Sequence, residues 1–223
     1  MLLYYITDRN QFPGDEAARR AALLAKVREC AGAGVDYIQL REKDLLAREL
    51  EKLTKLVVGA VHERSQHCRV LINSRIDIAI ACGADGVHLR SGDEDPNAGD
   101  ARAIFASAGA PTPVIAASCH SESEVDLAES HGADFVVFGP VFEKSTTSAK
   151  GLQELRRVCA TVSAGNEKTE AVARARLPVL ALGGVTLENA AQCVRAGAAG
   201  VAGIRLFQQN EVARVVSILK AAK

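Results

Sequence analysis

The sequence contains no tryptophan, and aromatic residues make up only 4% of its 223 residues. Alanine, valine, leucine and isoleucine must therefore supply most of a core, within an apolar share of 48% that is enough for a sizeable one. The shortage of aromatic rings argues against an RNA-binding protein that stacks bases on them. Such a composition is typical of strands and helices packed in layers.

The chain also lacks a net charge, since 27 basic residues balance 27 acidic ones. No global field draws it to nucleic acid or to a membrane, so we expect neither partner, and any binding of anions must be local. The N-terminus, MLLYYITDRN, has no basic leader and no apolar run long enough for a signal peptide or a membrane span. We expect a soluble, cytoplasmic protein.

None of the six cysteines forms a C-x-x-C pair, and their spacing matches no zinc pattern. Cys30, Cys82 and Cys193 lie near the ends of expected helices, shortly before a Gly-Ala pair. We interpret these thiols as buried and free, as in a reducing cytosol.

A Gly-Ala step followed by a short apolar run occurs four times. The copies begin at Gly32, Gly83, Gly132 and Gly197. Each follows an amphipathic helical pattern, and glycine can take the left-handed conformation that ends a helix. Successive copies are roughly 50 residues apart, with a longer last interval, and two β/α units fill about that length. Four copies therefore predict eight strands.

The remaining strands are expected at four continuous apolar runs: Leu2–Ile6, Val70–Ile72, Val114–Ala117 and Val179–Leu182. Continuous rather than alternating runs are typical of parallel strands that are covered on both faces. Eight such strands alternating with helices predict an α/β fold, a single (β/α)8 TIM barrel with parallel strands that forms one domain over residues 1–223. We place the extra length of the last interval in the polar segment Ser163–Arg176.

The active site of such a barrel collects where its strands end. Gln39, Arg41 and Lys43 close the second strand and would alternate onto one face, while Asp44 is a candidate N-cap for the next helix. Later strands end in further polar groups: Asn73, Ser74 and Arg75; His88, Arg90 and Asp93; Ser118 and His120. We interpret His88 as a structural histidine, whereas His120 is either a proton-transfer group or a structural one.

Two glycine-rich turns, Gly183-Gly184 and Gly203-Ile204, follow the seventh and eighth strands. Their backbone N–H groups can cradle a phosphate, although a glycine pair can also simply make a tight turn. The hydroxyl-rich loop Glu143–Lys150 is either a mobile lid for a diphosphate or an ordinary solvated connection. With its converging cations, this mouth suits a ligand that carries phosphate.

Taken together, these features resemble the thiamin phosphate synthase family and its relative, the thiazole tautomerase. The likeness spans nearly the whole chain. Its blocks are QLREK (39–43), INSRIDIAIACGADGVHL (72–89), SCHSESEVDLAESHGADFVVFGPVF (118–142) and LALGGVTLENAAQCVRAGAAGV (180–201).

The resemblance implies a transferase of thiamin biosynthesis with small-molecule phosphate and diphosphate substrates. It would join hydroxymethylpyrimidine diphosphate to thiazole phosphate, with loss of diphosphate before the thiazole nitrogen captures the pyrimidine cation. By position, the catalytic residues would be Arg41, Lys43 and His120. The substrate-binding residues would be Gln39, Asn73, Ser118, Thr146, Gly183, Gly184, Gly203 and Ile204. Asp93 would bind Mg²⁺, the implied cofactor.

The chain departs from the synthase pattern at several positions. Ser74 replaces a usual aspartate ligand of the metal, Arg90-Ser91 replaces Gly-Gln, and Arg205 replaces a phosphate-binding serine. One carboxylate instead of two weakens a magnesium site, although diphosphate supplies oxygens of its own. The tautomerase and a non-catalytic binder of thiazole phosphate or thiamin phosphate therefore stay open beside the synthase. The sequence is compatible with a homo-oligomer but does not determine the oligomeric state.

Overall fold

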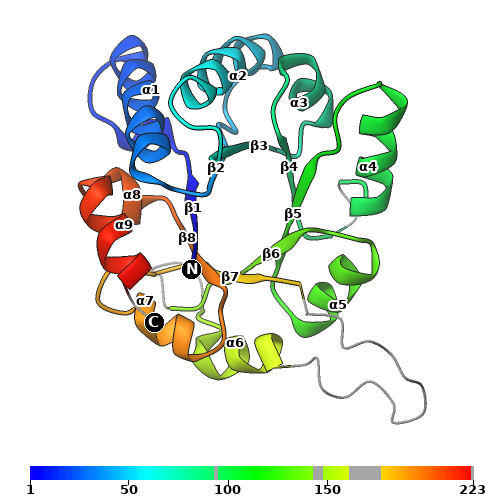
Figure 1. The fold of residues 1–223 in the computed structure, drawn as a ribbon, viewed down its shortest axis with the longest axis vertical. Helices are drawn as coiled ribbons and strands as arrows, with labels where there is room; N and C mark the ends of the chain where they lie inside the picture. Colours follow the sequence, from blue (N-terminus) through cyan, green and yellow to red (C-terminus); the bar gives the residue numbers. More distant parts are fainter. Residues whose placement is uncertain (93–94, 143–147, 161–176, 222–223) are drawn as a thin grey trace.

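The structure is a computed structural model that describes residues 1–92, 95–142, 148–160 and 177–221. Eight parallel strands close into a barrel in sequence order (Figure 1). They are β1 (Leu2–Ile6), β2 (Tyr37–Leu40), β3 (Arg69–Asn73), β4 (Gly86–Leu89), β5 (Val114–Cys119), β6 (Phe135–Phe138), β7 (Val179–Ala181) and β8 (Gly200–Gly203). Pairing of Leu3 in β1 with Val201 in β8 completes the ring. The predicted (β/α)8 barrel is confirmed.

Helices surround the ring of strands (Figure 1). They are the short 3₁₀ helix η1 (Arg9–Gln11), α1 (Glu16–Ala33), α2 (Ala47–His62), α3 (Ile76–Cys82), α4 (Ala98–Ser107), α5 (Glu122–Ser130), α6 (Gly151–Ala160), α7 (Ala190–Arg195), α8 (Arg205–Gln208) and α9 (Val212–Ala221). The segment Ser163–Arg176, where we placed the extra length, lies outside the described residues.

The repeated glycines end helices, as their spacing predicts. Gly83, Gly132 and Gly197 have positive φ angles of 65°, 78° and 102°. In the first copy the left-handed residue is Gly34 (φ 91°), whereas Gly32 still belongs to α1. The repeated Gly-Ala motif therefore marks the helix ends correctly, with a shift of two residues in its first copy.

In three of its four copies, the repeated Gly-Ala motif is followed by an aspartate that ties an even-numbered strand to the strand before it. Asp36, Asp85 and Asp134 accept a hydrogen bond from the backbone N–H of Leu3, Val70 and Ile115, at 2.7 to 2.8 Å. Their own backbone N–H groups donate back to the carbonyls of the same three residues. The fourth copy has Ala199 at this position. Three of the four repeats thus fix strand register at the N-terminal end of the barrel.

The interior of the barrel is partly aromatic. Its buried residues are Tyr4, Ile6, Leu71, Ala116, Phe135, Val137, Leu180 and Ala202. The ring of Phe135 packs against Tyr37 and Tyr4, with centroid distances of 4.7 and 5.5 Å. The core that surrounds the barrel is mainly aliphatic, as we expected, although it also contains Tyr5, Phe105, Phe138 and Phe207.

The cysteine prediction is confirmed in part. Cys30 and Cys193 are buried free thiols, whereas Cys82 is only partly buried. Burial raises the pKa of Cys193 to about 11, so its thiol stays protonated at neutral pH. Within the described residues, no helix has the length and apolar character needed to cross a membrane.

Candidate active site

Two amide side chains meet inside the barrel at the ends of β2 and β3. Gln39 pairs with Leu71, a residue of the barrel interior, and Asn73 lies two residues further along β3, so both side chains face inward. Nε2 of Gln39 donates to Oδ1 of Asn73 at 3.3 Å. The sequence analysis placed both residues at strand ends but did not predict the hydrogen bond between them.

Arg41 follows the end of β2 and is half-buried. Its backbone N–H donates to Oγ1 of Thr7 at 3.0 Å. Its guanidinium makes no hydrogen bond or ion pair with any residue in the described part of the chain. Burial, together with the positive charge of Arg41, lowers the pKa of His88. Arg41 is therefore a cation available to an anionic ligand.

Lys43 does not share the strand geometry of Gln39 and Arg41. The strand β2 ends at Leu40, and Lys43 is an exposed residue of the following turn. The expected alternation of three side chains therefore does not extend to Lys43, because the chain turns before reaching it.

The N-cap expected at Asp44 is wrong. Helix α2 begins at Ala47, and its N-cap residue is Leu46. The carboxylate of Asp44 instead accepts two hydrogen bonds from the guanidinium of Arg9, at 2.7 and 2.8 Å. A bidentate ion pair is stronger than a cap bond to a neutral backbone N–H.

His88 forms the middle of a buried hydrogen-bonded chain. Its Nδ1 lies 3.0 Å from the hydroxyl of Tyr4, and its Nε2 lies 2.8 Å from Oγ of Ser118. We assign the hydroxyl of Tyr4 as the donor to Nδ1, because Tyr4 is fully buried and its proton has no other partner among the described residues. Nε2–H then donates to Ser118, whose own proton is left to point toward a ligand. The assignment of His88 as structural is consistent with this geometry.

Burial, aided by the charge of Arg41, lowers the pKa of His88 to about 3. In the unfolded chain a histidine takes up its proton near pH 6.5. As pH falls from about 6.5 toward 3, the unfolded state therefore binds a proton that the folded state does not, and stability is lost.

We expect the free energy of unfolding of the wild type to fall faster than that of a His88→Gln variant over this pH range, by up to about 1.4 kcal/mol per pH unit. Urea titrations at several pH values measure the difference. His67→Gln, at an exposed histidine, is the matched control and should retain the wild-type slope. Equal slopes for the wild type and His88→Gln would contradict a neutral, buried His88.

A carboxylate that the sequence analysis missed lies beside Ser74. Oγ of Ser74 donates to Oδ2 of Asp95 at 2.8 Å, and Asp95 also accepts from the backbone N–H and Nη2 of Arg90, at 2.7 and 3.1 Å. Burial opposes ionisation of Asp95, but the bonds from Arg90 and Ser74 outweigh it and lower its pKa. Asp93, our candidate ligand, lies outside the described residues. The run Asp93-Glu94-Asp95 offered several carboxylates, and the sequence alone did not single out Asp95.

A cavity of about 360 Å³ opens beside this loop, between helices α4 and α5. Arg90, Asp95 and Ser118 contribute to its wall, together with Leu127 of α5 and His131, which follows that helix. The cavity therefore adjoins the mouth of the barrel on its β4–β5 side.

His120 stands at the exposed end of β5. Its Nδ1 lies 2.6 Å from the carbonyl oxygen of Gly139, which can only accept, so Nδ1 carries the proton. Nε2 is then the basic nitrogen of the neutral ring. The backbone N–H of His120 donates to Glu124 at 2.6 Å. The ring is thus oriented with one nitrogen able to exchange a proton.

The turn after β7 has a backbone conformation that favours glycine at two adjacent positions. Gly183 and Gly184 have φ angles of 94° and 64°, and a Cβ at Gly183 would lie 2.5 Å from Pro140. Their carbonyl oxygens accept hydrogen bonds from Phe142 and Asn189. Their backbone N–H groups donate to no residue in the described ranges. Two adjacent N–H groups are thus left over in this turn, as in anion-binding nests.

The turn after β8 lies beside it, since the two strands pair. The strand β8 ends at Gly203, and Ile204 packs against the barrel interior and precedes α8. Thr146 and most of the loop Glu143–Lys150 fall outside the described residues. Among the residues that are described, no group of three or more His, Cys, Asp or Glu side chains is placed to hold a metal ion.

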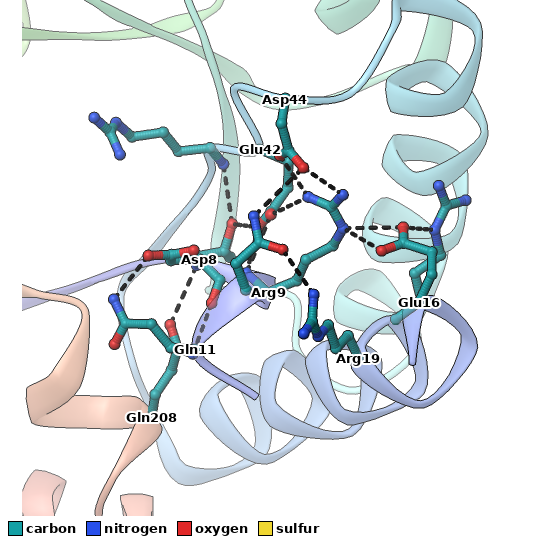
Figure 2. Close-up of polar contacts among 12 residues, drawn as sticks. Asp8, Arg9, Gln11, Glu16, Arg19, Glu42, Asp44 and Gln208 are labelled. Atoms are coloured by element: carbon teal, nitrogen blue, oxygen red, sulfur yellow. Dashed lines mark hydrogen bonds and ion pairs between the residues drawn. The ribbon is translucent and has the colours of Figure 1, made fainter. Parts of the chain in front are cut away.

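The largest feature missed by the sequence analysis follows β1, the strand for which we named no end residue. Thr7 and Arg9 are buried there and contact Glu42 of the β2–α2 loop (Figure 2). A polar Thr-Asp-Arg segment directly after an apolar strand was the available signal.

The family model described as thiamine monophosphate synthase matches residues 3–207. The chain belongs to this family. A Geobacter sulfurreducens protein provisionally assigned as a thiamine-phosphate synthase is 39% identical over 201 residues, which cover 90% of this chain and 83% of that protein. The thiamine-phosphate synthase of Chlorobium luteolum is 35% identical, covering 94% and 86%.

A solved structure supports the same family assignment. Thiamine phosphate pyrophosphorylase from Pyrococcus furiosus superposes with a TM-score of 0.75 and 29% identity, over 99% of this chain and 94% of that one. The chain is therefore a transferase of the thiamine-phosphate synthase type, with small-molecule phosphate substrates. These relatives favour the synthase over the tautomerase.

Proposed function

We propose that this chain couples hydroxymethylpyrimidine diphosphate to thiazole phosphate, releasing diphosphate and forming thiamin phosphate. The observation that carries the proposal is Arg41, a half-buried cation without an ion-pair partner among the described residues, next to the inward amides of Gln39 and Asn73. It stands in a chain whose family match covers residues 3–207. A reaction whose first step expels diphosphate needs fixed positive charge at that point.

The residues divide between the two substrates. Arg41, with Lys43, neutralises the departing diphosphate, and the amides of Gln39 and Asn73 with the hydroxyl of Ser118 hold the aminopyrimidine. The C–O bond to diphosphate breaks, and the lone pair of the thiazole nitrogen then attacks the resulting cation.

The thiazole phosphate occupies the turns after β7 and β8. There the N–H groups of Gly183 and Gly184, which donate to no described residue, support the assignment, next to Gly203 and Ile204. Thr146 would add a hydroxyl from the neighbouring loop. His120, with its basic Nε2, stands at the rim for a proton transfer.

Mg²⁺ is the proposed cofactor. Asp95 offers an ionised carboxylate beside the hydroxyl of Ser74, and Asp93 lies two residues away in sequence. These are hard oxygen donors, and magnesium commonly combines one or two carboxylates with oxygens of the substrate's phosphates. When bound, the ion would supply further positive charge to the leaving diphosphate.

The test is to supply purified protein with both substrates, with and without Mg²⁺, and to quantify thiamin phosphate and diphosphate. We expect both products in equal amounts, with turnover lost on chelation and restored by Mg²⁺. Isomerisation of a thiazole carboxylate phosphate without coupling, or binding without turnover, would overturn the proposal.

A further inference from the structure

Arg9 is buried and lies at the centre of an ionic cluster that follows the ends of β1 and β2 (Figure 2). Its guanidinium contacts three carboxylates: Glu42 at 3.0 Å, Asp44 at 2.7 Å and Glu16 at 3.0 Å. The side chains of Arg9 and Glu42 are only 4% and 1% exposed. With its charge neutralised in this way, Arg9 is not available to a ligand.

Glu42 is held by a second set of donors. The backbone N–H of Arg9 donates to both of its oxygens, at 3.1 and 3.2 Å, and the hydroxyl of Thr7 donates to Oε1 at 2.6 Å. Burying a carboxylate is costly, and burial raises the pKa of Glu42 despite these bonds. An arrangement that costs stability but fixes geometry points to a role in placing neighbouring groups.

Thr7 connects this cluster to the candidate active site. Its Oγ1 donates to Glu42 and accepts from the backbone N–H of Arg41 at 3.0 Å, and its own backbone N–H donates to the carbonyl of Gln39 at 2.9 Å. Thr7 therefore binds the chain on both sides of Leu40. The residues that it fixes, Gln39 and Arg41, are two of those assigned to the diphosphate substrate.

Arg9 and Arg41 differ in their carboxylate partners. Arg9 is saturated by carboxylates, whereas Arg41 has no carboxylate partner within the described ranges. Glu42 follows Arg41 directly in sequence, so a buried anion anchors the chain one residue away from the free cation. If Glu42 were not held by Thr7 and Arg9, its carboxylate could turn to pair with Arg41 and neutralise it.

We infer that Thr7, Arg9 and Glu42 are positioning residues, which hold the backbone at Arg41 so that its guanidinium faces the departing diphosphate. The inference rests on the proposed function. It predicts that loosening this anchor impairs diphosphate departure and leaves the thiazole phosphate side unaffected.

Thr7→Val tests the inference, because valine has the shape of threonine and lacks the hydroxyl. We expect kcat/KM for the diphosphate substrate to fall by about 10- to 100-fold, the usual effect of misplacing a reacting group. KM for thiazole phosphate should stay within about twofold, since its turns lie on β7 and β8. Thr7→Ser keeps the hydroxyl and should retain most of the wild-type activity.

Thr54→Val is the matched control. Thr54 is also fully buried, and its hydroxyl donates to the carbonyl of Leu50 within α2, away from the mouth. This variant should lose a comparable amount of stability and keep wild-type kinetics. Wild-type kinetics in Thr7→Val, or an equal loss in Thr7→Ser or Thr54→Val, would overturn the positioning role.

Binding of inorganic diphosphate, followed by calorimetry, separates this inference from the proposed function. If the wild type forms no thiamin phosphate, the proposed function fails, and weaker diphosphate binding by Thr7→Val than by Thr54→Val still supports the positioning of Arg41. If the wild type is active and Thr7→Val matches it in both binding and turnover, the positioning role alone fails.

Discussion

Replacing Arg41 with glutamine should lower kcat/KM for the diphosphate substrate by about 10²- to 10³-fold, the typical loss when one group that stabilises a developing negative charge is removed. The guanidinium of Arg41 makes no ion pair with the described residues. Its loss therefore breaks no ion pair or hydrogen bond among these residues, so stability should change little while the leaving diphosphate loses its counter-charge. Steady-state kinetics at saturating thiazole phosphate measure the effect.

Two further variants make this result interpretable. Arg41→Lys keeps the charge and loses the planar fork, so its activity should fall between the wild type and the glutamine variant. Arg75→Gln changes another arginine at the same edge of the barrel, whose guanidinium is already bound to Asp77, and should leave the kinetics nearly unchanged. Equal losses in Arg41→Gln and Arg75→Gln would show that general positive charge at the mouth, rather than Arg41, matters.

The barrel was predictable because its signals are local. A glycine that ends a helix and a continuous apolar run are both determined within a few residues, and the copies at Gly83, Gly132 and Gly197 mark helix ends as expected. The placement of Gln39 and Asn73 at the ends of neighbouring strands follows from the same local signals, whereas the hydrogen bond between them was not predicted. Where an element is regular, its residues can be assigned to faces from sequence.

The errors arose where the chain leaves regular structure and a distant residue decides the outcome. Asp44 has the residue type of an N-cap, but Arg9, 35 positions away, takes its carboxylate. Alternation would place Glu42 on the outer face with Leu40, yet nothing local shows that Thr7 and Arg9 cover it. Similarly, the choice of Asp95 depends on Ser74 and Arg90, which reach it from neighbouring turns.

Replacing Arg9 with methionine should destabilise the protein by about 3 to 5 kcal/mol, because it leaves the buried carboxylate of Glu42 without its counter-charge. For a chain of this size, that loss corresponds to a melting temperature lower by about 6 to 20 °C. Urea titration and thermal melting at neutral pH measure both quantities. Lys55→Met, which breaks the exposed Glu51–Lys55 pair, is the control and should leave both quantities nearly unchanged, because water screens an exposed ion pair.

The double variant Arg9→Met with Glu42→Gln separates loss of the ion pair from loss of packing. Removing the buried charge as well should recover a large part of the stability, since the penalty arises from an uncompensated charge rather than from a missing contact. The deficit of Arg9→Met should also shrink as pH falls, because the pKa of Glu42 is raised by burial and its protonated form is tolerated better. If the double variant is as unstable as Arg9→Met alone, and the deficit is the same at all pH values, Arg9 stabilises the fold through packing. If stability is recovered without activity, the cluster serves the position of Arg41 and not merely the stability of the barrel.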